Sequence, residues 1–149
     1  MQRHHLLPRE LSLRSCFAPM FAWVGRERIG FEDFRINGML LPASEEEAAR
    51  TGLPLHRGPH GHYNAMVAER LGQIESGWAA RNLRSSDAAQ TEALMRMRLL
   101  QAALRRRLIQ RGMRPILLNR HDPLGHGVDF SALDAMADLL WGETAIPGL

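Results

Sequence analysis

Residues 53–64 read LPLHRGPHGHYN and place three of the chain's seven histidines, His56, His60 and His62, within a few positions. This stretch opens directly into a strongly amphipathic segment. Two further histidines, His4 and His5, stand side by side at the start of the chain. We expect the two histidine clusters to meet in space around one divalent metal ion.

The bulk composition indicates a single globular domain spanning residues 1–149. A chain of 149 residues with 45% hydrophobic content can bury a core without disulfides. The apolar runs are too short to span a bilayer, so no membrane partner is expected, and the first residues lack the apolar region of a signal peptide. We therefore expect cytoplasmic synthesis, with export as an effector by a route without a cleavable signal left open. The single cysteine, Cys16, reads as a small buried hydrophobe.

The charge pattern permits a polyanionic partner without selecting one. All 19 basic residues are arginines, and the net charge is +3. Arginine suits bidentate phosphate contacts better than lysine does. GC-rich codon usage explains the absence of lysine equally well.

The first third of the chain predicts short elements. Residues 4–8 read as an extended piece stopped by a proline, and residues 20–24 as a short helix begun by Pro19. Residues 26–30 read as a loop, and residues 31–36 carry apolar anchors ahead of the turn signal Asn37-Gly38. Residues 39–42 read as a second strand-like piece, and residues 43–52 as one or two helical turns.

Two long helices follow. Tyr63, Val67, Leu71, Ile74 and Trp78 step by three or four residues, which places them on one helical face. A second helix is predicted over 87–110, capped by Ser86 or Asp87 and stopped by Gly112, after a loop at 79–87. Its arginine run 105–107 reads as a solvated helix end that complements the dipole, rather than as a phosphate patch. A strand over 115–119, a loop over 122–127 and a last helix over 131–141 complete the reading. The predicted fold class is α+β and predominantly helical.

The histidine spacing points to metal chemistry but does not establish it. Adjacent histidines on an extended chain face opposite sides, so one can bind a metal while the other faces a different space. His56 and His60 have the spacing of paired imidazole ligands on one helical face. His62, His121 and His126 read as exposed or loop residues. From composition and spacing alone, the conclusion stops at a candidate metal site.

Three motifs in order resemble a known family. His4-His5-Leu-Leu-Pro8, Asn37-Gly-Met-Leu-Leu-Pro42 and His56-Arg-Gly-Pro-His60-Gly-His-Tyr63-Asn64 are similar to the AHH family of the HNH/endonuclease VII superfamily of nucleases. The resemblance covers roughly residues 3–75. It implies a ββα-metal core, a small β-hairpin plus a helix around one divalent ion. We place this core at residues 3–79, followed by a helical C-terminal extension at 80–149.

The resemblance also implies roles for individual residues. His4 and His60 would be metal ligands, with His56 as a further ligand candidate. His5 would be the general base that deprotonates water, and Asn37, after the second strand, would hold the base or its loop in position. The ion implied is Mg²⁺, Zn²⁺, Ni²⁺ or Mn²⁺.

Residues around these motifs carry weaker expectations. Arg57, Arg3 and Arg9 flank the histidines and are candidates for contacting the substrate phosphate. Arg3 stands where the family pattern has alanine. Asn64 is a weaker candidate for supporting the site, and Tyr63 reads mainly as core.

Together these features predict a metal-dependent endonuclease that hydrolyses phosphodiester bonds in DNA, with DNA favoured over RNA. A toxin or effector role would add an immunity or inhibitor protein as partner. Two alternatives stay open. One is a catalytically degenerate metal- or nucleic-acid-binding module on the same scaffold, and the other is a helical protein-interaction domain.

Overall fold

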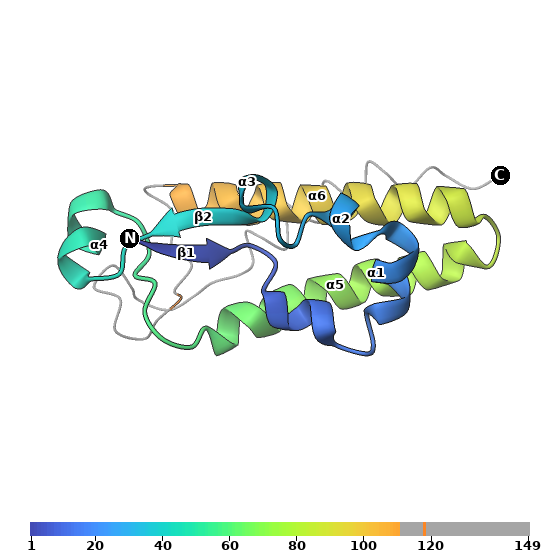
Figure 1. The fold of residues 1–149 in the computed structure, drawn as a ribbon, viewed down its shortest axis with the longest axis horizontal. Helices are drawn as coiled ribbons and strands as arrows, with labels where there is room; N and C mark the ends of the chain where they lie inside the picture. The colour runs from blue at the N-terminus through green and yellow to red at the C-terminus, as the bar shows by residue number, and fades with distance from the viewer. Residues whose placement is uncertain (111–117, 119–149) are drawn as a thin grey trace.

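The computed structural model describes residues 1–110 and 118 (Figure 1). Over these residues the chain is mostly helical with one two-stranded antiparallel hairpin, which confirms the predicted fold class. In chain order the elements are β1 (Gln2–His5), the 3₁₀ helix η1 (Arg9–Leu13), α1 (Ala18–Val24), α2 (Arg26–Ile29), α3 (Phe34–Asn37), β2 (Gly38–Leu41), α4 (Glu45–Thr51), α5 (Gly61–Asn82) and α6 (Ser86–Ile109). Only Leu118 of the predicted strand over 115–119 is among the described residues. Gly112, His121, His126, the loop over 122–127 and the helix over 131–141 lie outside them.

The hairpin sets which histidine faces the interior. β1 pairs antiparallel with β2, and the Cα partners are His4 with Met39 and His5 with Gly38. Because side chains alternate along a strand, His4 is buried while Arg3 is exposed and His5 is half-buried. The short first strand is therefore paired along its whole length.

Asn37 lies before the second strand, not after it as predicted. The side chain of Asp33 accepts a hydrogen bond from the backbone N–H of Arg35 and caps a single turn, α3, that ends at Asn37. Gly38 then begins β2. The sequence Asn37-Gly38 is consequently a helix-to-strand junction and not a hairpin turn.

The two long helices run antiparallel along the molecule (Figure 1). The predicted face of α5 is confirmed, since Tyr63, Val67, Leu71, Ile74 and Trp78 are all buried. The cap of α6 is Ser85, whose side-chain oxygen accepts from Ala88 N–H, one residue earlier than predicted. The predicted loop over 79–87 shrinks to 83–85 because α5 continues to Asn82.

One hydrophobic cluster joins the long helices to the connection between the strands. It contains Leu6, Leu11, Phe21 and Ile29 from that connection together with the buried faces of α5 and α6. Within residues 1–110 and 118, no helix is both long enough and apolar enough to cross a membrane.

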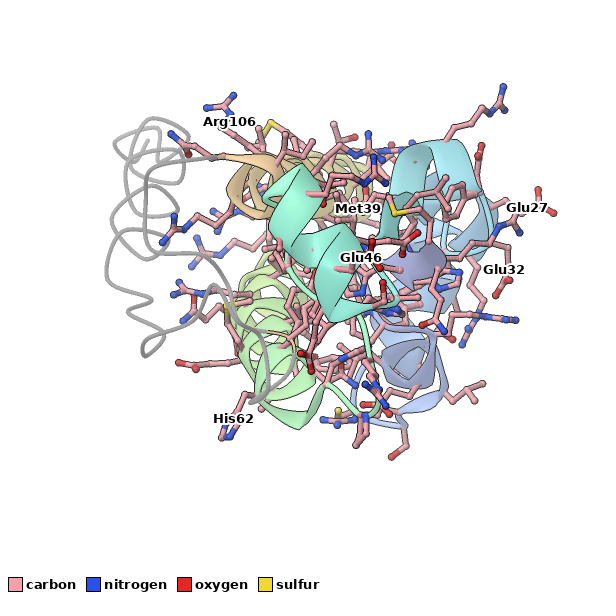
Figure 2. All side chains as sticks on the ribbon, turned by 90° about the vertical axis from the view of Figure 1, so that its left-hand side faces the viewer. Glu27, Glu32, Met39, Glu46, His62 and Arg106 are labelled. Carbon is pink, nitrogen blue, oxygen red and sulfur yellow. The ribbon has the colours of Figure 1, made fainter. Side chains whose placement is uncertain are left out.

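Three local predictions are wrong. Residues 26–30 were predicted to be a loop, but residues 26–29 form α2, because Gly30 at φ 78° supplies the left-handed residue that ends the helical turn. Cys16 is exposed, since it precedes α1 and only the next residue, Phe17, turns into the core. The arginine run 105–107 is not simply solvated: Arg106 points outward (Figure 2), but Arg107 is buried and Arg105 donates to three backbone carbonyls.

Candidate metal centre

Three imidazoles from two distant segments converge on one point. His4 comes from β1, His56 from the extended stretch before α5, and His60 from the N-cap position of α5. One ring nitrogen of each lies within 4.8 Å of the others. Ligands about 2.1 Å from a tetrahedral ion are about 3.4 Å apart. Small side-chain rotations therefore bring the three nitrogens to coordination distance.

The surroundings keep His4 and His56 neutral, as metal ligands must be. Burial, followed by the neighbouring His56, His60 and His5, lowers the pKa of His4 to about 3. Burial, followed by His60 and His5, lowers the pKa of His56 to about 4. His4 is only 2% exposed, and its Nε2 has no hydrogen-bond partner among the described residues. A buried, neutral imidazole nitrogen facing two more imidazoles fits a transition-metal site.

Two contacts fix how the ligand rings are turned. Nδ1 of His56 lies 3.1 Å from Oε1 of Gln2, and Nδ1 of His60 lies 3.3 Å from the carbonyl oxygen of Leu118. Both partners are acceptors, so we assign the proton to Nδ1 of each ring, which leaves Nε2 with its lone pair for a metal. The sequence offered no signal for either partner.

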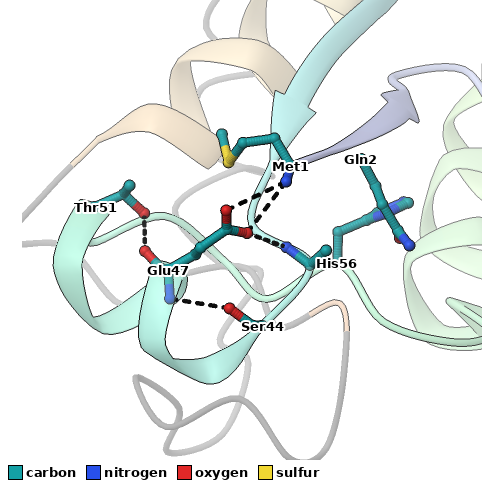
Figure 3. Close-up of polar contacts among 7 residues, drawn as sticks. Met1, Gln2, Ser44, Glu47, Thr51 and His56 are labelled. Carbon is teal, nitrogen blue, oxygen red and sulfur yellow. Dashed lines mark hydrogen bonds and ion pairs between the residues drawn. The ribbon is translucent and has the colours of Figure 1, made fainter.

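The end of the hairpin holds Gln2 and His56 together. The backbone N–H of His56 donates to the carbonyl oxygen of Pro42 at 2.8 Å, which ties the ligand stretch to the residue after β2. Beside them, the carboxylate of Glu47 on α4 accepts from the backbone N–H of Ala43 at 3.0 Å and faces the amine of Met1 (Figure 3). This polar cluster anchors the start of β1, and with it Gln2.

His5 faces away from the three converging rings. It is half-buried, and burial, then Arg9, lowers its pKa, while Glu32 raises it and Arg3 lowers it further. Arg3, two residues before His5 on β1, and Arg9 on η1 thus place positive charge near His5. The predicted division of the histidine pair into an inward and an outward member matches the alternation of β1.

Asn37 is buried and forms hydrogen bonds with the backbone that follows the histidine pair. Its Oδ1 accepts from Leu7 N–H at 2.8 Å, and its Nδ2 donates to the carbonyl oxygens of Leu7 at 3.0 Å and Phe31 at 3.1 Å. Its own carbonyl accepts from Leu6 N–H at 2.8 Å. None of these bonds reaches His5, so any support of the base passes through the backbone of residues 6–7.

A family described as "a nuclease family of the HNH/ENDO VII superfamily with conserved AHH" matches residues 1–104, more than half of the chain. The chain belongs to the AHH family. Membership confirms the resemblance drawn from the three motifs, and it implies nucleic acid as the substrate. No curated protein and no solved structure matches the chain.

The arginines near the histidines of this AHH-family chain differ in how they are held. The guanidinium of Arg3 stacks over the ring of Phe34, 4.7 Å from its centroid. Arg9 forms an ion pair with Glu32 at 3.1 Å. Arg57 is exposed, beside His56.

The remaining residues singled out from the AHH motifs are not among the three converging imidazoles, although the ring of Tyr63 packs edge-on against that of His4, with 4.9 Å between centroids. Asn64 donates to a carboxylate oxygen of Glu10 at 2.9 Å, directed toward η1 rather than toward His60. Tyr63 is core, as predicted, and its hydroxyl donates to the carbonyl oxygen of Leu6 at 2.7 Å. His62 points into solvent (Figure 2), as predicted.

Proposed function

We propose that this protein is a metal-dependent endonuclease that hydrolyses phosphodiester bonds in DNA. The observation that carries the proposal is the convergence of His4, His56 and His60, with His5 beside them on the other side of β1. Family membership supplies the nuclease activity. The metal, the substrate and the residue roles are our additions.

His4, His56 and His60 would hold the ion. Three imidazoles favour Zn²⁺ or Ni²⁺ over Mg²⁺ and Mn²⁺, which prefer oxygen ligands. A divalent ion bound there would act as a Lewis acid toward a phosphate oxygen and the leaving oxygen. The chain would present three imidazole lone pairs to the ion. Gln2 and the Leu118 carbonyl orient two of the rings, those of His56 and His60, through Nδ1.

His5 is assigned as the general base. Its lowered pKa keeps the imidazole neutral near pH 7, so that a ring nitrogen can accept a proton from water. The oxygen of that water forms a new bond to phosphorus as the bond from phosphorus to the 3′-oxygen breaks, and the 3′-oxygen leaves and takes a proton from solvent. The proton stays on His5 until it exchanges with solvent, for which the half-exposed position of the ring is suited.

Arg3 and Arg9 are assigned to the substrate backbone. Both act electrostatically on His5, which places their positive charge near the base. Stacking on Phe34 limits the freedom of Arg3, so less entropy is lost when it contacts a phosphate. Arg57 is the corresponding candidate on the ligand stretch. Phosphate contacts carry no base information, so we expect low sequence specificity.

Cleavage of supercoiled plasmid tests the proposal directly. Wild type, His5→Ala, His4→Ala and the exposed control His62→Ala would be compared with Mg²⁺, Mn²⁺, Ni²⁺ and Zn²⁺. We expect His5→Ala to retain metal and cleave ~10²–10⁴-fold more slowly. His4→Ala should lose metal binding, and His62→Ala should match wild type. Equal cleavage by wild type and His5→Ala would refute the role of His5.

The same samples separate the alternative functions. Metal binding without cleavage under any of the four ions would favour the degenerate metal-binding module. Cleavage of a matched RNA in preference to DNA would overturn the choice of substrate. The toxin or effector role, its immunity partner and export stay predictions from the sequence.

A further inference from the structure

A row of polar side chains on α6 donates hydrogen bonds to backbone carbonyl groups in and next to the connection between the strands. Arg98, Gln101 and Arg105 are three and four residues apart, so they project from one face of the helix. Arg98 donates to the carbonyl oxygen of Arg28. Gln101 Nε2 donates to the carbonyl oxygen of Ile29 at 3.2 Å.

Arg105 occupies the other end of the row. Its Nη2 lies 2.9 Å from the carbonyl oxygen of Arg35, 3.1 Å from that of Ile36 and 3.0 Å from that of Gly38. Carbonyl groups at the end of a short helix have no partner within the helix. Arg105 therefore supplies a charged donor at the junction between α3 and β2, around Asn37.

Gln101 reaches Asn37 directly. Both side chains are buried, at 3% and 0% exposure, and Gln101 Nε2 lies 3.3 Å from Asn37 Oδ1. Asn37 Oδ1 thus faces two donors, Gln101 and Leu7 N–H, while its Nδ2 faces two carbonyl oxygens. This arrangement permits only one orientation of the Asn37 amide.

The amide of Gln101 is constrained in the same way. Its neighbours Ile29 O and Asn37 Oδ1 are both acceptors, so the amide nitrogen must face them. As a result Gln101 Oε1 is buried without a hydrogen-bond partner among the described residues. A buried unpaired oxygen costs free energy, so the contribution of Gln101 at this position is its two donated hydrogen bonds.

We propose that Gln101 and Arg105 are positioning residues of the nuclease site. Gln101 fixes Asn37, Asn37 fixes the backbone of Leu6 and Leu7, and that backbone continues directly from His4 and His5. Arg105 fixes the junction on which Asn37 sits. The inference rests on the proposed nuclease function, and it adds α6 to the hairpin and α5 as an element that supports the nuclease site.

Gln101→Leu tests the link because leucine fills a similar volume without a donor. The matched control is Arg98→Ala, which removes a bond from the same helix face that does not involve Asn37. Backbone amide exchange at Leu7 and the split between kcat and KM on plasmid DNA are measured for both. Gln101→Leu should speed exchange at Leu7 and lower kcat ~10- to 100-fold with little change in KM, because misplacement by about 1 Å costs that much. Arg98→Ala should leave both unchanged.

Arg105→Lys is the second variant, for use if Gln101→Leu does not fold. Lysine keeps the charge but loses the planar fork, and Arg106→Lys at an outward-pointing position is its control (Figure 2). We expect Arg105→Lys, and not Arg106→Lys, to lower kcat. Wild-type kcat and wild-type exchange at Leu7 in Gln101→Leu would overturn the inference while leaving the nuclease function intact. An inactive wild type would refute the function, and exchange at Leu7 would still report on the link.

Discussion

Gly38 is a position where one added methyl group should have a large steric effect. Its backbone, at φ −131° and ψ 159°, is an extended conformation that any residue adopts, so alanine adds no backbone strain. A Cβ there would lie 2.0 Å from Cδ2 of Phe34, 2.4 Å from Cε2 and 2.6 Å from Cγ. Ordinary contact begins at 3.4 Å, so the ring would have to move by about 1.4 Å.

That movement is opposed because the Phe34 ring also contacts a second residue. The guanidinium of Arg3 stacks over the ring, 4.7 Å from its centroid. Overpacking of this kind typically costs about 1–3 kcal/mol. We therefore expect Gly38→Ala to lower the free energy of unfolding by that amount. Because Gly38 is the Cα partner of His5, plasmid cleavage should fall as well.

Urea unfolding of four proteins decides whether the ring is the cause. These are wild type, Gly38→Ala, Phe34→Ala and the double variant. Removing the ring removes the three nearest contacts of a Cβ at 38, so Gly38→Ala should cost less than about 0.5 kcal/mol of unfolding free energy in the Phe34→Ala background. The same cost in both backgrounds, or a wild-type midpoint for Gly38→Ala, would refute the reasoning.

Three further predictions follow from other contacts. Gln2→Ala should weaken metal binding about 10- to 100-fold by calorimetry, because Nδ1 of His56 loses its acceptor. Gln2→Glu keeps an acceptor and should bind metal at least as tightly as wild type. Equal metal affinity of the two variants would contradict this. The metal-free protein should be most stable above about pH 7 and should lose stability as the pH falls through 6.5. The reason is that the pKa of His4 is lowered to about 3 by folding from 6.5 in the unfolded chain. His4 should therefore reduce the free energy of unfolding by up to about 1.4 kcal/mol per pH unit. Thermal unfolding between pH 8 and 5 checks this, and His4→Asn should flatten the dependence where His62→Asn does not. Asn37→Ala should lower the free energy of unfolding, measured with urea, by about 3 kcal/mol or more, since Leu7 N–H and the carbonyl oxygens of Leu7 and Phe31 lose their buried partner. A loss below about 1 kcal/mol would mean that water replaces the amide.

The parts of the fold that were predictable are those whose signal is local. Five apolar residues at helical spacing predicted the buried face of α5, and the helical turns predicted within 43–52 are α4. The alternation of β1 predicted that His4 and His5 face opposite sides. The clustering of His4, His56 and His60 needed more than spacing, because it depends on a strand and a loop far apart in the chain.

The contacts that were missed depend on long-range packing. Gln2 and Leu118 meet the ligand rings only through the tertiary fold, and nothing in their own neighbourhoods marks them. Arg105 looked like a solvated helix end because the sequence does not show that α3 ends against it. Gln101 did carry a signal: it falls on the apolar stripe of α6, four residues after Met97, where a polar side chain implies a buried partner.

The connection between the strands explains why the site depends on so many remote residues. Thirty-two residues, 6–37, separate β1 from β2, where a tight hairpin uses about three. Closing the longer loop costs roughly 2 kcal/mol more, and a two-stranded hairpin is only marginally stable by itself. The strand that carries His4 and His5 must therefore be held from outside the hairpin, by Asn37 on its inner side and by α6 behind Asn37. It follows that metal binding at His4 should protect β1 and the Leu6 and Leu7 amides against exchange together, because all three are held by the same long-range contacts.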